Sequence, residues 1–98
     1  MVKHMIIWKL RPDVDDPHAR IADIKSSLEA LVGVIDGLCE MKILTDSLPS
    51  STGDVMMDST FLTPEALEAY KEHPAHLAVA NSKVRPFVEK RLAFDYKL

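Results

Sequence analysis

Three residues in the stretch 70–76 carry side chains that can take part in acid–base chemistry. They are Tyr70, His73 and His76. A neutral imidazole has an ordinary pKa of about 6.5 and can accept a proton near neutral pH, while a phenol can donate to a carbonyl oxygen. His76 could instead be a buried histidine that caps a helix or bonds a strand, and Tyr70 could be a core aromatic. His73 directly precedes Pro74, and this position favours a capping role.

These histidines do not predict a metal site. His73 and His76 are three residues apart, and the sequence brings no third ligand to them. The one cysteine, Cys39, has no basic neighbour that would lower its pKa, and the chain has no glycine-rich phosphate loop. We therefore expect neither a metal nor an organic cofactor.

A fourth candidate, His4, lies in a segment that alternates like a strand. His4 shares one face of this strand with Ile6 and Trp8. A polar ring that is buried on an apolar face needs a partner, and Asp95 in the last predicted strand could provide it. The alternative is a histidine at the strand end, in water. Trp8 could line a pocket for a flat apolar ligand, although core or dimer packing is the commoner role of such a residue.

The elements that must position these side chains follow from periodicity and from helix-start signals. Asp16-Pro17 and Thr63-Pro64 are typical helix starts, and His73-Pro74 interrupts or restarts the second helix. The predicted strands cover 2–10, 38–46, 54–62 and 91–97, and the apolar stripe of the first helix runs from Ile21 to Ile35. The order βαββαβ predicts an α+β, ferredoxin-like protomer, with a four-stranded antiparallel sheet and helices on one face.

The second face of this sheet has no element left to cover it. It would carry the apolar side chains of Met5, Ile7, Leu92, Phe94 and Tyr96. A second copy that packs sheet against sheet would cover them, so we expect a homodimer. The 98 residues, 1–98, are expected to form a single domain.

Composition narrows the class of partner. Twelve basic and fifteen acidic residues give a net charge of −3, which argues against binding to nucleic acid or to an anionic membrane. The apolar run near the N-terminus is too short and too charged for a signal peptide or a spanning helix. We expect a soluble, cytoplasmic protein whose partners are itself and a small molecule.

Several segments together resemble the Dabb family of stress-responsive dimeric α/β-barrel proteins. The resemblance covers nearly the whole chain, and its most specific part is the His-Pro-x-His element after a Tyr. The segments are Val2-Lys3-His4, the stretch from Leu31 to Gly37, the stretch from Tyr70 to His76, Val84-Arg85-Pro86 and Phe94-Asp95-Tyr96.

The resemblance implies a ferredoxin-like protomer that dimerises into a barrel. One branch of the family, plant polyketide cyclases of the olivetolic acid cyclase type, closes a ring by aldol condensation without a cofactor. By segment match its catalytic pair falls on Tyr70 and His76, and His4 and Asp95 match residues of the same pocket. This sequence departs from that branch in the loop 47–53 and in many helix residues that would line the pocket for the substrate tail.

Two functions remain open from the sequence. The first is a stress-responsive dimer that binds a small apolar or aromatic ligand between helices and sheet, with His4, Trp8, His73 and Asp95 as ligand-binding residues. The second is a cofactor-independent enzyme, an aldol cyclase or an isomerase, in which His76 is the base and Tyr70 the hydrogen-bond donor. A cofactor-free monooxygenase is a weaker variant of the second.

Overall fold

All three α-helices begin at a proline that follows a capping side chain. In the computed structural model, which describes residues 1–98, the caps are Asp16, Thr63 and His73. Each side chain accepts a hydrogen bond from a backbone N–H in the first turn, at 3.0 to 3.2 Å. Proline is suited to the position after the cap because its missing N–H would have no helical partner there.

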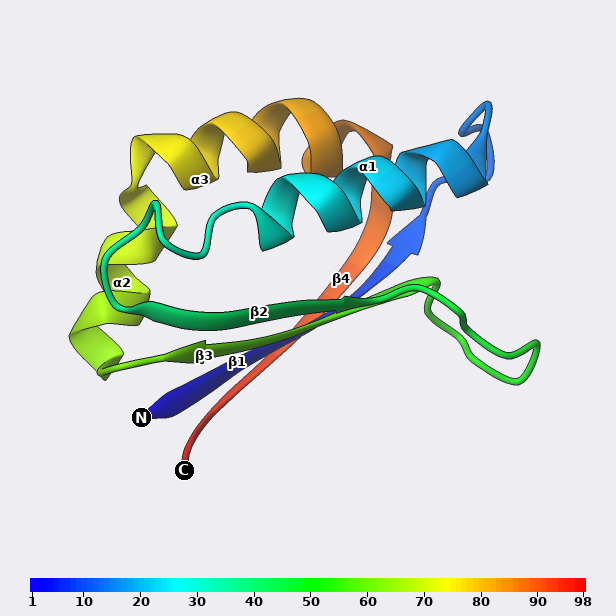
Figure 1. Cartoon of the computed structure of the whole chain (residues 1–98). Coiled ribbons are helices and arrows are strands. Elements are labelled where there is room, and N and C mark those ends of the chain that lie inside the picture. Colours follow the sequence, from blue (N-terminus) through cyan, green and yellow to red (C-terminus); the bar gives the residue numbers. More distant parts are fainter.

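The elements run in the predicted order. They are β1 (Val2–Leu10), α1 (Pro17–Glu29), β2 (Leu38–Leu44), β3 (Val55–Phe61), α2 (Pro64–Glu72), α3 (Pro74–Val79), a π-helical turn (Ala80–Val84), a 3₁₀ turn (Arg85–Phe87) and β4 (Val88–Lys97). The strands form one antiparallel sheet in the order β2-β3-β1-β4. The helices lie on one side of the sheet (Figure 1). The predicted ferredoxin-like α+β fold is therefore confirmed.

Several boundaries differ from the sequence prediction, since β2 ends at Leu44 rather than at residue 46 and β3 covers Val55–Phe61 rather than 54–62. Two larger differences concern α1 and β4. The helix α1 ends at Glu29, although Leu31 and Ile35 of the predicted stripe are buried. Short turns follow α1, in which the N–H of Leu31 donates to the Leu28 carbonyl and that of Val34 to the Leu31 carbonyl. These turns keep nearly helical spacing, so the stripe alone could not show where the helix ends. The strand β4 begins at Val88 rather than at residue 91, because Val88 pairs with Leu10 across an irregularity in β1.

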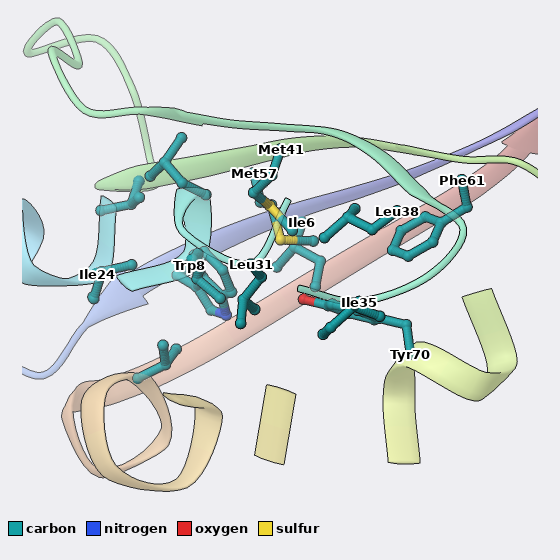
Figure 2. Close-up of a cluster of buried hydrophobic side chains, with 14 of the residues drawn as sticks. Ile6, Trp8, Ile24, Leu31, Ile35, Leu38, Met41, Met57, Phe61 and Tyr70 are labelled. Carbon is teal, nitrogen blue, oxygen red and sulfur yellow. The ribbon is translucent and has the colours of Figure 1, made fainter. Parts of the chain in front are cut away.

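The core lies between the sheet and the helices. Figure 2 shows Ile6 and Trp8 from β1 and Phe61 from β3 facing Ile24 of α1 and Tyr70 of α2. All five side chains are buried. Because alternate strand residues point to opposite faces, β1 places its even-numbered side chains beneath the helices.

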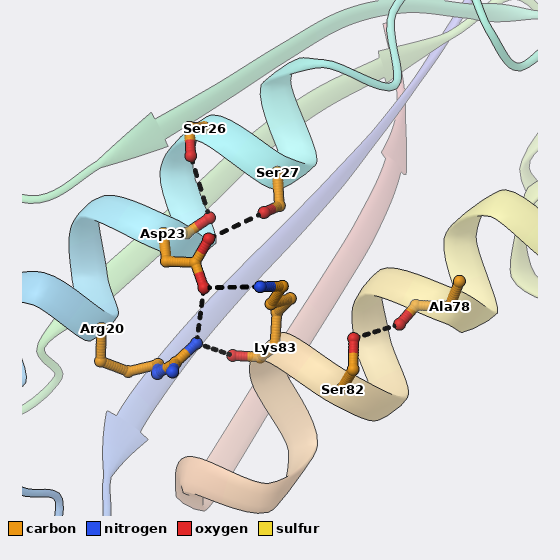
Figure 3. Close-up of polar contacts among 7 residues, drawn as sticks. All are labelled: Arg20, Asp23, Ser26, Ser27, Ala78, Ser82 and Lys83. Carbon is orange, nitrogen blue, oxygen red and sulfur yellow. Dashed lines mark hydrogen bonds and ion pairs between the residues drawn. The ribbon is translucent and has the colours of Figure 1, made fainter.

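A polar cluster ties the π-helical turn to α1. The Asp23 carboxylate accepts from Arg20 at 2.9 Å, from Lys83 at 3.1 Å and from the Ser27 hydroxyl at 3.2 Å (Figure 3). The Arg20 guanidinium also lies 3.9 Å from the centre of the Phe87 ring. These contacts hold the segment between α3 and β4 against α1.

The other face of the sheet carries an exposed apolar patch on β1 and β4, beside the ion pair of Lys3 with Asp58 at 2.8 Å. Leu92 is 71% exposed and Phe94 is 68% exposed, and Ile7 and Tyr96 lie beside them on the same face. No element of the chain covers these side chains. The expectation of an apolar open face is therefore confirmed.

Two glycines in the loop before β2 can be compared to show whether close packing against α2 contributes to stability. Both have positive φ, 88° at Gly33 and 83° at Gly37. A Cβ atom at Gly37 would lie 2.6 Å from the Cβ of Ala66 in α2, whereas one at Gly33 would meet nothing. We expect Gly33→Ala to lower the free energy of unfolding by about 1 kcal/mol, and Gly37→Ala by about 2–4 kcal/mol.

Urea unfolding followed by circular dichroism measures both values. Adding Ala66→Gly to Gly37→Ala should recover part of the loss, because it removes the atom that the new methyl group meets. Equal costs at the two glycines would show that the contact with α2 does not matter.

Candidate functional site

A cavity of about 580 Å³ opens between the sheet and the helices. Its walls combine apolar side chains of the core with polar side chains of α2, α3 and β4. The lining residues are His4, Ile6, Trp8, Leu28, Met57, Tyr70, Lys71, His76, Ala80, Val84, Arg85, Val88, Glu89 and Arg91. The cavity is large enough for a small organic molecule.

The break between α2 and α3 sets the orientation of His76. Pro74 has no N–H, and the Ala75 N–H donates to the His73 ring at 3.0 Å instead of continuing the helix. The Lys71 carbonyl, which would have accepted that N–H in an unbroken helix, contacts Nδ1 of His76 at 3.2 Å. A carbonyl only accepts, so Nδ1 carries the hydrogen and Nε2 is left with a free lone pair. No other side chain bonds Nε2.

The electrostatic surroundings keep the His76 ring neutral. Burial lowers its pKa below the ordinary value of 6.5, and the positive charges of Arg85 and Arg91 act in the same direction. The hydrogen bond to the Lys71 carbonyl acts in the opposite direction, but the net shift is downward. His76 is therefore a neutral proton acceptor near pH 7.

Tyr70 lies next to His76, with 4.2 Å between the ring centres, and packs edge-on against Phe61 at 4.9 Å. Its hydroxyl forms no hydrogen bond within the chain and is not completely buried, although Tyr70 as a whole is only 1% exposed. The side chain lines the cavity. Burial raises the pKa of Tyr70, so the phenol keeps its proton and can donate a hydrogen bond.

His4 and Asp95 form a contact across neighbouring strands. The two residues are register partners in β1 and β4, and Nδ1 of His4 lies 2.5 Å from a carboxylate oxygen of Asp95. The carboxylate fixes the ring, because it can only accept from Nδ1. The Ser59 hydroxyl holds the same strand by donating to the His4 carbonyl at 2.6 Å.

The structure brings four of the six predicted site residues to one cavity. His4, Trp8, Tyr70 and His76 line it. Asp95 contacts Nδ1 of His4 and does not line the cavity. His73 does not line it either, because its ring caps α3. Asp95 and His73 are both among the ligand-binding residues that the sequence predicts, but neither side chain lines the cavity.

The charged residues of the cavity were not predicted. They are Lys71, Arg85, Glu89 and Arg91. Only Arg91 had a signal in the sequence, since it alternates with Asp95 along the last strand and therefore shares its face. Lys71 and Arg85 reach the cavity through the helix break and the turn before β4, which periodicity does not describe. Glu89 lies in the first residues of β4, before the start of the predicted strand.

No group of three or more His, Cys, Asp or Glu side chains in the chain is arranged so that it could hold a metal ion. His73 and His76 thus have no third ligand of these types. No helix of the chain has the length and apolar character needed to cross a membrane.

The fold and cavity place the chain in a known class of ferredoxin-like proteins. The family model for the stress responsive A/B barrel domain, Dabb, matches residues 2–98, so the chain belongs to the Dabb family. No curated protein matches the chain significantly in sequence.

Solved structures agree with this assignment. A dimeric, ferredoxin-like protein of unknown function from Bacteroides fragilis has 27% identity and a TM-score of 0.89, covering 99% of this chain and 95% of its own. A protein from Arabidopsis thaliana has 27% identity and a TM-score of 0.84, covering 100% and 95%. A hydroxynitrile lyase from Passiflora edulis has 20% identity and a TM-score of 0.80, covering 97% and 90%, which shows a shared fold alone.

The lowered pKa of His76 predicts how stability depends on pH. Below about pH 6.5 the unfolded chain takes up a proton at His76 more readily than the folded chain does. The free energy of unfolding should therefore fall as the pH falls from about 7 to about 5, and His76→Gln should make this slope shallower. Chemical denaturation at a series of pH values measures the slopes.

The matched control is His18→Gln, at an exposed histidine of α1 outside the cavity. This variant should keep the wild-type slope. If His76→Gln also kept it, burial of the imidazole would not disfavour its charged form.

Proposed function

We propose that this protein is a cofactor-independent acid–base enzyme, an aldol cyclase or isomerase in class, that acts on a small carbonyl compound. One observation carries the proposal. The free Nε2 of His76 and the free hydroxyl of Tyr70 belong to adjacent rings, 4.2 Å apart between centres, that line one cavity. A base and a hydrogen-bond donor so placed can act on a single ligand carbonyl group.

The proposed reaction begins with proton transfer. Nε2 of His76 takes a proton from the carbon next to a carbonyl group, and the C–H electron pair forms an enolate. Tyr70 donates a hydrogen bond to the enolate oxygen as its negative charge develops. In a cyclase the enolate carbon then bonds a second carbonyl carbon of the same molecule. The resulting alkoxide recovers the proton from His76, so the imidazole ends neutral.

The rest of the cavity suits an apolar or aromatic substrate body. Ile6, Trp8, Leu28 and Met57 contribute apolar side chains to its lining. His4 contributes a second imidazole, whose orientation Asp95 fixes. Binding a small apolar or aromatic ligand is thus the first step of the proposed activity. The Passiflora edulis neighbour is named as a lyase, so the fold is compatible with enzymatic activity, but the proposal depends on His76 and Tyr70.

The functional unit that we propose is a homodimer formed through the open sheet faces. The exposed apolar side chains of Ile7, Leu92, Phe94 and Tyr96 support it, as does the dimeric Bacteroides fragilis relative. The cavity lies on the opposite face of the sheet, so a partner on the open face would leave it intact within each protomer.

The catalytic prediction uses a panel of linear β-polyketones and β-diketones whose ring closure or isomerisation is followed by absorbance. We expect His76→Gln to lower kcat by about 10²–10⁴-fold and Tyr70→Phe by about 10–10³-fold. The wild-type rate should fall on the acidic side, at a pH below the ordinary histidine pKa of 6.5.

His18→Gln is the control for the loss of a histidine and should keep the wild-type rate. Equal rates for wild type and His76→Gln would remove His76 as the base. Ligand binding without turnover by the wild type would reduce the protein to a binding module.

The dimer prediction compares neighbouring residues of β4 that point to opposite faces. Phe94→Asp puts a charge on the open face and should yield monomers in size-exclusion chromatography with light scattering. Ala93 pairs with Ile6 and faces the helix side, so Ala93→Asp should remain dimeric. A monomeric wild type at micromolar concentration would refute the proposed interface.

A further inference from the structure

We propose that the substrate carries a carboxylate, and that Arg91 and Arg85 hold it at the mouth of the cavity. The inference rests on the proposed function, since it names the class of carbonyl compound that reaches His76: a keto acid. Its basis is the distribution of the arginines and of their partners.

The chain has four arginines, and they divide by location. Arg11 is paired with Asp13 at 3.0 Å and Arg20 with Asp23 at 2.9 Å, and both lie outside the cavity. Arg85 bonds only the neutral side chain of Asn81, at 2.6 Å, and Arg91 has no side-chain partner. The two arginines without a carboxylate partner are thus the two that line the cavity.

The charge at the cavity is opposite to that of the whole protein. Three cations, Lys71, Arg85 and Arg91, and one anion, Glu89, line it, so its formal charge is 3 − 1 = +2, against −3 for the chain. Lys71 is partly neutralised by Glu68 at 3.2 Å. The uncompensated positive charge therefore belongs to the two arginines.

Arg91 lies on the same side of the sheet as Tyr70 and His76, and all three line the cavity. Arg91 is the register partner of Trp8, so its side chain leaves β4 on the helix side of the sheet. Leu92 and Phe94, which the proposed dimer would cover, alternate to the other side. Arg85, Arg91 and His76 line the same cavity. A ligand that spans this cavity can therefore contact an arginine at one end and His76 at the other.

A carboxylate suits these residues better than a phosphate does. The planar guanidinium matches the two oxygens of a carboxylate, and a bidentate pair both orients and binds the ligand. Glu89 at the same mouth repels a dianion more strongly than it repels a monoanion. In the proposed pose the carboxylate contacts the arginines, the ketone lies at Tyr70 and His76, and the apolar body lies against Trp8.

The test compares a stable aryl keto acid, 4-oxo-4-phenylbutanoate, with its methyl ester. Trp8 is the only tryptophan of the chain and lines the cavity, so quenching of its fluorescence reports binding directly. The acid should bind about tenfold more tightly than the ester, which corresponds to one charge-assisted hydrogen bond. Its affinity should fall with added salt, whereas that of the ester should not.

Variants at exposed positions show which residues cause the preference for the acid over the ester. Arg91→Gln and Arg85→Gln should each weaken binding of the acid about 5–10-fold and leave the ester within about twofold. Glu89→Gln should strengthen binding of the acid. Arg11→Gln removes the same charge outside the cavity and should change neither ligand.

Equal affinity for acid and ester, or equal weakening of both by Arg91→Gln, would overturn the carboxylate site and leave the proposed acid–base activity standing. Loss of turnover in His76→Gln together with an intact preference for the acid would support both. A preference for the acid with no effect of His76→Gln on turnover would support the carboxylate site and refute the base. Phenyl phosphate binding more tightly than the keto acid would assign the mouth to phosphate and refute the carboxylate.

Discussion

The structure depends on the difference between the two faces of its four-stranded sheet, one covered by the helices and the other exposed. Every helix lies on one side, so side chains that alternate along β1 have different surroundings (Figure 1). His4, Ile6 and Trp8 point beneath the helices, where the core and the cavity form. Ile7 points to the opposite face, which stays apolar and exposed. The alternation of side chains along a strand thus places the candidate site and the proposed dimer surface on opposite faces of the sheet.

The break between α2 and α3 frees a backbone carbonyl that contacts a side chain of the cavity. Pro74 removes one backbone donor, and the His73 ring accepts the next donor, from Ala75. The freed carbonyl of Lys71 then contacts His76 and selects its tautomer. In an unbroken helix this carbonyl would already be bonded. His73 therefore caps α3 next to the cavity and does not line it.

Burial acts on both candidate catalytic groups and favours the neutral form of each. It raises the pKa of Tyr70, whose charged form is a phenolate, and lowers that of His76, whose charged form is an imidazolium. The phenol thus remains a donor and the imidazole remains an acceptor. The exposed arginines at the mouth add positive charge near His76 without being buried themselves. Burial therefore favours both the hydrogen-bond donor form of Tyr70 and the proton acceptor form of His76.

The sequence by itself determined the features that depend on near neighbours. The helix starts at Pro17, Pro64 and Pro74, the alternation of β1 and the open apolar face could be read from local patterns. The sequence also predicted Asp95 as a partner for His4, which the structure confirms. The tertiary structure alone decided that α1 ends at Glu29, that Asp95 stays outside the cavity, and that Arg85 and Glu89 reach it. The physical reason is range: caps and strand faces depend on residues a few positions apart, whereas a cavity is assembled from elements that packing brings together.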